Sequence, residues 1–544
     1  MTTRRAFLRG ALAAAPTFAF APHGWPRARG APFDLVLRGG TVVDGTGAPG
    51  RPADVAIRGD RIAEVGDIGS VEAARVIDVR GLVVAPGFVD AHAHSDLRRQ
   101  PTAASKVLQG VTIDVCGPDG GSPFPDAADA DEPKERACAD FAAWRQQHGA
   151  IAIDIGAYVG HGTVRQHVLG PVGRAPSGDE LAAMRRLLAT AFEQGALGLS
   201  SGLEYFPGNA AATDELVQLC KVAAAHDRPY VTHIRNEDDR VVEAVDEAIA
   251  IARRSGAPLL VSHLKIGGSA NWPKLEAVLA RIEAARKDHE VHADCYPYDA
   301  WHTSLATNFP AWSKEGGRFV ERLQDPAERE RMRAETEAAV AANGGWGTLM
   351  LGNGLAAVDR DLLGQRLDAA ARERSVEPFQ LACDLLTRGN VSILGFGIRE
   401  DQMDTILCQP WCLVASDGSA AVASGRTGHP RSFGTFPRVF RRHVRELGRL
   451  SVEEAVRKMT SLPATVLRLA DRGTIAAGRL ASLVAFDAAA FTDRATWLEP
   501  QRYAEGVRFL VVNGAVAVDA GTPTGVRAGR VVARQAAPAP RVQR

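Results

Sequence analysis

The feature that most constrains this chain is a regular alternation of short apolar segments with longer amphipathic segments through its middle. The short segments have the length and composition of buried β-strands, and the segments between several of them have helical spacing. This alternation predicts an α/β fold, a parallel (β/α)8 barrel of the TIM type. The candidate strands are residues 87–92, 111–115, 151–158, 196–200, 229–233, 259–263, 291–295 and 412–416.

The two ends of the chain have a different texture. Residues 33–84 and 469–533 contain short alternating segments and turn residues such as Gly39-Gly40. We therefore expect one small β-sandwich built from both termini, around a barrel domain at residues 85–468. Residues of about 300–347 are first aromatic and then strongly charged, and we expect them to form an inserted subdomain. Residues 391–396 are a ninth candidate strand, one more than the barrel needs.

The first 32 residues resemble an export signal. Arg4-Arg5 begins a stretch similar to the twin-arginine signature, and a moderately apolar segment follows at residues 10–21. Ala19-Phe20-Ala21 is a cleavage candidate, although Pro22 favours a later site, before Phe33. We expect the twin-arginine machinery to export the folded protein, which would then be periplasmic or secreted. Residues 534–544 are predicted to be a disordered tail.

The overall composition excludes several kinds of partner. Lys plus Arg and Asp plus Glu both number 64, so the formal net charge is zero and nucleic acid is not an expected partner. Beyond the signal segment, no apolar run is long enough to anchor the chain in a membrane. The seven cysteines are widely spaced and indicate no disulfide framework.

Histidines end three of the candidate strands. His92 and His94 form a His-x-His pair, and side chains two residues apart in a strand face the same way. His233 and His263 each end a further strand. Because the carboxyl ends of barrel strands meet at one mouth, the four imidazoles predict a site for a divalent ion such as Zn²⁺.

Other charged residues share these strand ends. Arg235 and Lys265 each follow a histidine by two residues, so they face the same way and could bind a substrate carboxylate. Asp417 follows the last candidate strand. Beside a metal ion it could take a proton from activated water and later deliver it, as the general acid/base. The structural alternative for Asp417 is an N-cap of the next helix.

These motifs together resemble the amidohydrolase superfamily and, within it, the N-acyl-D-amino-acid deacylase (D-aminoacylase) family. The similarity runs in order from about Phe33 to about Asp519, nearly the whole mature chain. The segments that carry it are 85–94, 109–112, 195–208, 233–237, 262–265, 294–298, 416–418, 429–431 and 459–464.

The resemblance implies the same barrel, terminal β-sandwich and small insertion, and it also assigns roles. His233 and His263 would be the core metal ligands. A second position, weaker or empty, would be lined by His92, His94 and Asp417. The resemblance further implies one or two divalent ions, most simply zinc. The residues that would orient the substrate and its α-carboxylate are Tyr205, Lys265, Tyr296 and Arg431.

One position departs from the family pattern. The best-known members place a cysteine ligand in a turn after the second strand, and Asp119 stands at that position here. Asp119 could ligate the metal through oxygen, and Glu204, a water or a shifted Cys116 are the alternatives. An oxygen ligand is harder than a thiolate and widens the choice of ion to Mn²⁺ or Fe²⁺.

The expected reaction is hydrolysis of a small-molecule N-acyl-D-amino acid to a carboxylate and a free amino acid by metal-activated water, with Asp417 as general acid/base. A dipeptidase or a cyclic-amide hydrolase is the alternative within the superfamily, and a non-catalytic binding protein is the remote one. His161 either lines the pocket or structures a loop. Trp301 and His302 either close over the acyl group or serve packing alone.

Overall fold

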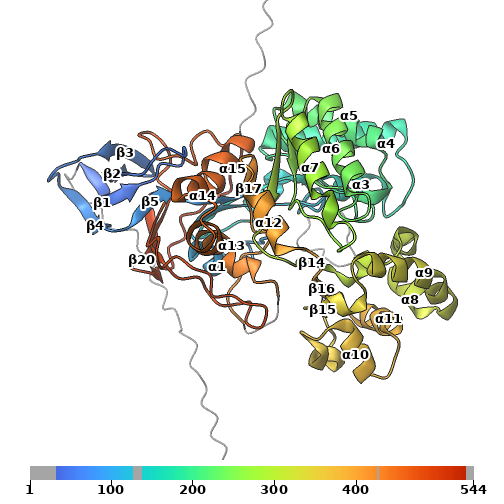
Figure 1. Ribbon diagram of the computed structural model, residues 1–544. Helices are drawn as coiled ribbons and strands as arrows, with labels where there is room; N and C mark the ends of the chain where they lie inside the picture. The colour runs from blue at the N-terminus through green and yellow to red at the C-terminus, as the bar shows by residue number, and fades with distance from the viewer. Residues whose placement is uncertain (1–31, 127–137, 425–427, 535–544) are drawn as a thin grey trace, which may run out of the picture.

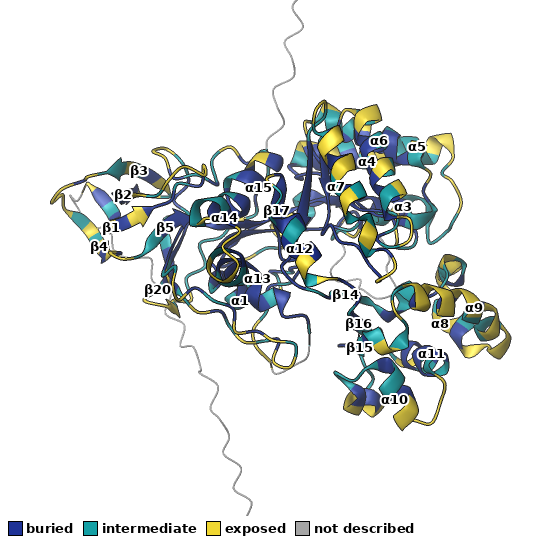
Figure 2. Cartoon of the chain, in the orientation of Figure 1, coloured by how far each residue is buried: buried dark blue, intermediate teal, exposed yellow. Residues whose placement is uncertain are grey.

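The computed structural model describes residues 32–126, 138–424 and 428–534. The predicted signal segment and the predicted tail lie outside these residues, apart from one boundary position each, and both stay predictions. The middle of the chain alternates strands and helices as expected, with strands in the interior and helices around them (Figures 1 and 2).

Eight parallel strands within the described residues build the barrel, and each coincides with one of the candidates. They are β6 (Phe88–Asp90), β7 (Val111–Cys116), β8 (Asp154–Ala157) continued by β9 (Val159–Gly160), β10 (Leu199–Gly202), β11 (Tyr230–His233), β12 (Leu259–Val261), β13 (Val291–Cys295) and β17 (Cys412–Val414). β6, β7 and β8 pair in sequence, and β9 to β13 and β17 form the second run. A parallel bridge between Ala93 and Gly418, just beyond β6 and β17, closes the ring.

Helices cover the outside of the barrel because each has one apolar face. α6 buries Val241, Val245, Ile249 and Ala252, which recur at helical spacing. The interior is filled by apolar side chains from the strands, such as Val231 of β11. The covering helices are α3 (His161–Leu169), α4 (Gly178–Gln194), α5 (Thr213–Ala225), α6 (Val241–Ser255), α7 (Leu275–Ala285), α12 (Glu400–Leu407) and α14 (Val452–Met459).

Both termini contribute to one nine-stranded sheet at the end of the molecule that is coloured blue in Figure 1. β18 from the C-terminal part pairs antiparallel with β5 from the N-terminal part, which is the joint contribution expected from the sequence. The strands are β1 (Phe33–Val42), β2 (Arg51–Arg58), β3 (Arg61–Gly66), β4 (Ala73–Asp78), β5 (Val83–Pro86), β18 (Leu483–Phe486), β19 (Val507–Val512), β20 (Ala515–Asp519) and β21 (Thr522–Pro523).

The inserted subdomain is larger than residues 300–347. A separate hydrophobic cluster reaches from Leu305 to Ile393, and the ninth candidate strand belongs to this unit as its central strand, β16. The alternation of apolar and amphipathic segments did not reveal the full extent of the subdomain, because its own helices and short strands have the same sequence pattern as barrel elements. It comprises β14 (Trp301–Ser304), α8 (Phe319–Gln324), α9 (Pro326–Ala342), β15 (Leu349–Leu351), α10 (Leu367–Glu373), α11 (Pro378–Arg388) and β16 (Ser392–Gly395), and it projects from the barrel in Figure 1.

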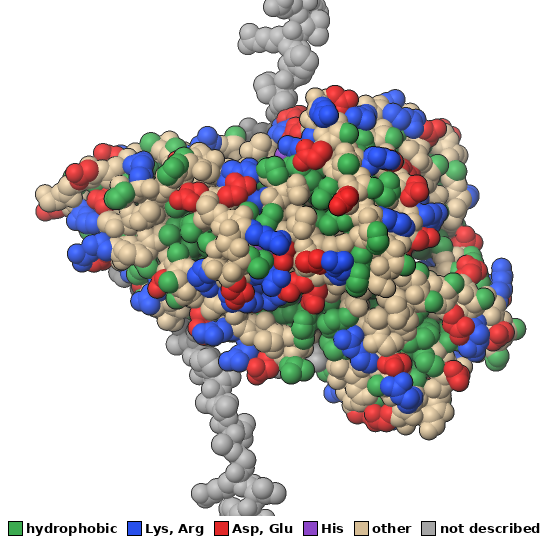
Figure 3. All heavy atoms as spheres, in the orientation of Figure 1, with side chains coloured by type: hydrophobic (Ala, Val, Ile, Leu, Met, Phe, Trp, Pro, Cys, Tyr) green, Lys and Arg blue, Asp and Glu red, His purple; other side chains and the backbone are tan. Residues whose placement is uncertain are grey.

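The surface agrees with the balanced composition. Basic and acidic side chains are interspersed over the face shown in Figure 3, which carries no large area of one sign. None of the described helices is long and apolar enough to cross a membrane. The remaining α-helices of the described residues are α1 (Ala104–Val107), α2 (Phe141–Gln146), α13 (Arg431–Val439) and α15 (Ser461–Val466).

Candidate metal centre and active site

A cavity of about 860 Å³ opens where the barrel strands end. Its lining includes side chains that follow β6, β7, β11, β12 and β17, and also side chains from the inserted subdomain. The structure therefore brings together residues that are hundreds of positions apart in the sequence. The predicted residues that line this cavity are His94, Asp119, Tyr205, His233, Arg235, His263, Lys265, Asp417 and Arg431.

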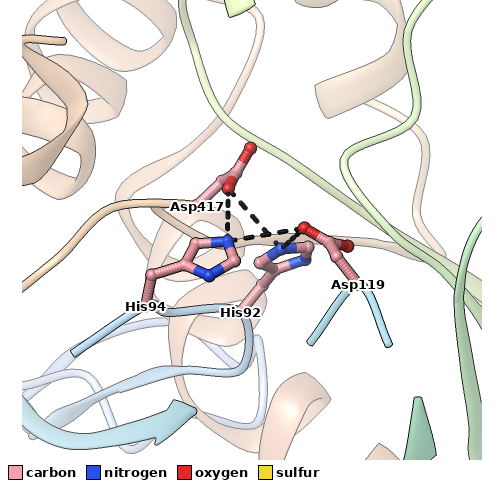
Figure 4. Close-up of side chains that lie close together, drawn as sticks. All are labelled: His92, His94, Asp119 and Asp417. Atoms are coloured by element: carbon pink, nitrogen blue, oxygen red, sulfur yellow. Dashed lines mark hydrogen bonds and ion pairs between the residues drawn. The ribbon is translucent and has the colours of Figure 1, made fainter. Parts of the chain in front are cut away.

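The first group of possible ligands is His92, His94, Asp119 and Asp417 (Figure 4). The Nε2 atoms of His92 and His94 lie 3.3 and 3.4 Å from Asp119 Oδ2. His94 Nε2 also lies 3.1 Å from Asp417 Oδ1. Two imidazoles and two carboxylates that converge on one point form a suitable donor set for Zn²⁺ or a harder divalent ion.

The second group is Asp119, His233 and His263. His233 Nδ1 is 3.0 Å from His263 Nε2, and His263 Nε2 is 3.4 Å from Asp119 Oδ1. Asp119 Oδ1 is buried and has no hydrogen-bond donor among the described residues. A buried carboxylate oxygen without a donor, beside two imidazole nitrogens, fits a bound cation.

Three of these possible ligands have left-handed backbone conformations. The φ angles of Asp119, His263 and Asp417 are 56°, 31° and 48°. Non-glycine residues rarely adopt this region, and such strain concentrates at functional sites. In each case the turn comes directly after a barrel strand, and it directs the side chain towards the cavity instead of along the strand.

Carboxylates behind the imidazoles fix their orientation. His92 Nδ1 faces Asp294, at 3.3 Å, and His263 Nδ1 faces Glu237 Oε1, at 3.0 Å. When each Nδ1 donates its proton to the carboxylate, each Nε2 keeps a lone pair for the metal. Sequence reasoning assigned no role to Asp294 or Glu237, although both lie in segments that carried the family resemblance.

Lys265 contacts one of these carboxylates, Glu237. Its Nζ lies 2.6 Å from Glu237 Oε2 and 2.9 Å from His263 Nδ1. Burial disfavours charge on both partners, but each charge stabilises the other, so the pKa of Glu237 is lowered and that of Lys265 is raised. In this structure Lys265 therefore holds Glu237, which in turn orients His263.

Asp417 pairs with Arg431 on the opposite side of the first ligand group. Arg431 Nη1 is 2.7 Å from Asp417 Oδ2, and the guanidinium carbon lies 4.9 Å from the centre of the Tyr296 ring. Burial opposes ionisation of Asp417, but the Arg431 charge and the hydrogen bond from His94 hold its pKa below the usual range. Arg431 Nε has no hydrogen-bond partner among the described residues.

The other residues predicted to bind substrate differ in whether their polar groups already have partners within the protein. Arg235 lines the cavity, but its guanidinium binds both carboxylate oxygens of Glu247 and two backbone carbonyls. It is therefore engaged in structure, and its predicted substrate contact gains no support. The Tyr205 ring is tilted against the His233 ring, with ring centres 4.6 Å apart, and the buried Tyr296 hydroxyl has no partner among the described residues.

The structure places Asp119, Cys116 and Glu204 differently, and these are the candidates for the position where the family has a cysteine ligand. Cys116 packs in the main hydrophobic core, and burial raises its pKa to about 12, so its thiol belongs to no ligand group found in the described residues. Glu204 belongs to a third possible ligand group, with His233 and Glu237. Its Oε2 lies 3.2 Å from His233 Nε2, whereas His233 Nδ1 faces His263. Asp119 is thus the residue placed between the histidines.

The structure also bears on the roles of His161 and His302, for which the sequence allowed two interpretations each. His161 is fully buried, bonds Glu215 and does not line the cavity, which favours the structural role. His302 lines the cavity, and burial together with the Arg431 charge lowers its pKa to about 4, so it is a neutral imidazole near the centre.

A parallel barrel with histidines and aspartates gathered at its strand ends defines a metal-dependent hydrolase. The profile of the amidohydrolase family matches residues 75–382 and 401–518, and this chain belongs to that family.

Relatives resemble it over nearly their whole length. A D-aminoacylase of Alcaligenes xylosoxydans xylosoxydans is 36% identical over 93% of this chain and 99% of its own. An N-acyl-D-glutamate deacylase of the same organism is 37% identical over 93% and 97%. The crystal structure of an N-acyl-D-glutamate deacylase from Bordetella bronchiseptica, complexed with zinc and a phosphonate inhibitor, has a TM-score of 0.79 and 33% identity, covering 92% of this chain and 100% of that one.

Proposed function

We propose that this protein hydrolyses the amide bond of N-acyl-D-amino acids to a carboxylate and a free D-amino acid. The observation that carries the proposal is the convergence of His92, His94, His233 and His263 with Asp119 and Asp417 at one end of the barrel, beside Arg431. The relatives that match nearly the whole chain agree with it, since they are a D-aminoacylase, an N-acyl-D-glutamate deacylase and an N-acyl-D-aspartate deacylase.

The residues of the chain divide the work. A bound divalent ion, which we propose to be zinc, supplies a Lewis acid for the amide carbonyl and lowers the pKa of water. His92, His94, His233, His263, Asp119 and Asp417 would hold it. We propose that Arg431 and the Tyr296 hydroxyl bind the α-carboxylate, which would fix the amide beside Asp417. Asp417 accepts the proton of the attacking water and delivers it to the leaving amine.

The alternatives fit the cavity less well. Cyclic-amide hydrolases of this superfamily commonly bridge their metals with a carboxylated lysine, and β10 contains no lysine. A dipeptidase needs to bind a free amino group, and the carboxylates close to the centre are engaged with histidines and with Lys265. A binding protein would have no need for Asp417 in a strained conformation beside the ligand histidines.

The test is a hydrolysis screen of the purified protein with N-acetyl derivatives of D- and L-amino acids, dipeptides and hydantoins. The proposal predicts release of free amino acid from the N-acetyl-D series, with the L series at least about tenfold slower in kcat/KM, a difference of roughly 1.4 kcal/mol. Preference for dipeptides or hydantoins would contradict it.

We also propose that the protein is exported folded through the twin-arginine route, on the strength of Arg4-Arg5 and the apolar segment behind them. Replacing both arginines with lysine should leave the enzyme in the cytoplasm of the expressing bacterium. Equal periplasmic amounts of the variant and the wild type would contradict this route.

A further inference from the structure

We infer that Arg235 is a positioning residue, which fixes Tyr205 against the His233 ring and does not itself contact the substrate. The kinetic part of the inference rests on the proposed function, because it concerns the reaction in this cavity. It goes further by giving a task to a residue whose guanidinium already has partners, and by naming the side chain through which that task reaches the site.

The guanidinium of Arg235 is held by one carboxylate and two backbone carbonyls. Its Nε and Nη2 donate to the two carboxylate oxygens of Glu247 on α6, at 2.7 and 3.0 Å. Its Nη1 and Nη2 also donate to the carbonyl oxygens of Asn209 and Ala211, each at 3.0 Å. These bonds occupy most N–H groups of the guanidinium, so Arg235 joins α6 to the loop that follows β10.

The loop that Arg235 holds carries Tyr205. Asn209, whose carbonyl accepts from Arg235, donates its own N–H to the Tyr205 carbonyl at 2.8 Å. On the other side of Tyr205, the Leu203 N–H donates to the His233 carbonyl at 3.1 Å. Both sides of the Tyr205 segment are therefore tied to the end of β11, one through the backbone of His233 and the other through the side chain of Arg235.

The Tyr205 ring is closely packed, so a shift of this loop would move it relative to the site. Its centre lies 4.6 Å from that of the His233 ring, and both residues line the cavity. A Cβ on Gly202 would lie 2.7 Å from Tyr205 Cδ2, which shows that the ring packs directly on the backbone of β10. A displacement of about 1 Å in an active site can cost roughly 100-fold in rate.

A substrate contact and a positioning role for Arg235 predict different kinetics. If the guanidinium bound the substrate, its loss would raise KM whether or not Tyr205 were present. If it positions Tyr205, its loss should lower kcat, and the effect should disappear once the Tyr205 side chain is removed. Glu247 offers an independent variant, because it does not line the cavity and can influence the site only through its partners.

The kinetic test is a double-mutant cycle of Arg235→Lys and Tyr205→Ala, at equal metal content. We expect kcat on N-acetyl-D-amino acids to fall about 10- to 100-fold in Arg235→Lys, with KM within about twofold of wild type. In the Tyr205→Ala background the same change should cost less than about threefold. Glu247→Gln should lower kcat in the same direction by a smaller factor.

Three results of the cycle would overturn the inference. They are additive losses in the double variant, a rise in KM without a fall in kcat in Arg235→Lys, and a wild-type kcat in Tyr205→Ala. The last result would leave no side chain whose position matters.

A second readout needs no turnover. Hydrogen–deuterium exchange in the peptide that covers residues 203–211 should be faster in Arg235→Lys than in wild type. Glu247→Gln should show the same change, which covers the case in which Arg235→Lys does not fold. The matched control is Arg253→Lys, also on α6, whose partner Asp288 lies 2.6 Å away on the surface, and it should leave exchange and kcat unchanged.

The two readouts separate this inference from the proposed function. Unchanged exchange of residues 203–211 in both Arg235→Lys and Glu247→Gln would overturn the positioning role. Faster exchange in a protein that hydrolyses no N-acyl-D-amino acid would contradict the proposed function alone.

Discussion

Arg431 Nη1 lies 2.7 Å from Asp417 Oδ2, with both side chains almost completely buried beside the ligand histidines. The pair joins the residue expected to bind the substrate's carboxylate to the residue expected to move protons. When a substrate carboxylate binds Arg431, it shares the positive charge of the guanidinium with Asp417. The electrostatic attraction between Arg431 and Asp417 is thereby weakened. Substrate binding and proton transfer are thereby coupled through two adjacent side chains.

Replacing Asp417 with asparagine keeps its shape but removes its capacity to accept a proton. Because positioned general acid/base groups contribute about 100-fold or more to rates, kcat should fall by at least that factor. Steady-state kinetics on N-acetyl-D-amino acids measures this, with Asp179→Asn, an exposed residue in the first turn of α4, as the matched control. A variant within threefold of wild type would remove Asp417 from the mechanism.

Replacing Arg431 with lysine keeps a positive charge but loses the planar fork that matches a carboxylate. Hydrogen bonds to charged groups contribute roughly 1.5–3 kcal/mol, so kcat/KM should fall about 10- to 100-fold. Substrates whose α-carboxylate is replaced by a carboxamide should lose much less, and comparing the two substrate series checks this. Equal losses in both series would show that Arg431 does not bind the α-carboxylate.

Lys106 is a buried cation beneath the centre and holds its first and last strands together. Its Nζ lies 2.5 Å from Asp90 Oδ2, 3.3 Å from Asp114 Oδ1 and 2.9 Å from the hydroxyl of Ser416, the residue before Asp417. Lys106→Met leaves two buried carboxylates uncompensated and should lower the free energy of unfolding by about 3–5 kcal/mol. Denaturant titration measures this, and adding Asp90→Asn should recover part of the loss.

Acid should destabilise the protein through His292, a buried neutral histidine outside the possible ligand groups. Burial, reinforced by the Arg286 charge, lowers the pKa of His292 from 6.5 to about 4. The unfolded chain therefore binds this proton at a higher pH than the folded chain, so the free energy of unfolding decreases as pH falls from 6.5 towards 4. His292→Asn should flatten this slope in denaturant titrations, and an unchanged slope would rule out the His292 contribution.

The barrel was predictable because its evidence is local. Each strand, such as β11 or β12, is an apolar run that ends in a polar residue, and the helices between them carry their own periodicity. The proximity of the four histidines was predictable for the same reason, since strand ends meet at one mouth. The size of the inserted subdomain was not, because β16 has the same apolar character as a barrel strand and only its antiparallel partners reveal where it belongs.

The carboxylates behind the imidazoles, Glu237 and Asp294, could be recognised only from three-dimensional contacts. Nothing in the spacing of Glu237 or Asp294 indicates that each faces a ligand imidazole, because the partners lie on different strands. Arg235 shows the reverse: its position two residues after a ligand histidine suggested substrate binding, but Glu247 on α6 takes up its guanidinium. A charged residue at the end of a barrel strand therefore indicates that it lies near the site, but not that it contacts the substrate.

The most direct test of the central claim is amide hydrolysis before and after metal removal. The account predicts that protein stripped with a chelator stays folded by circular dichroism, releases no D-amino acid from N-acetyl-D-amino acids, and recovers when Zn²⁺ is restored. His263→Ala should not recover to the same rate. Full turnover by the metal-free protein would contradict the account.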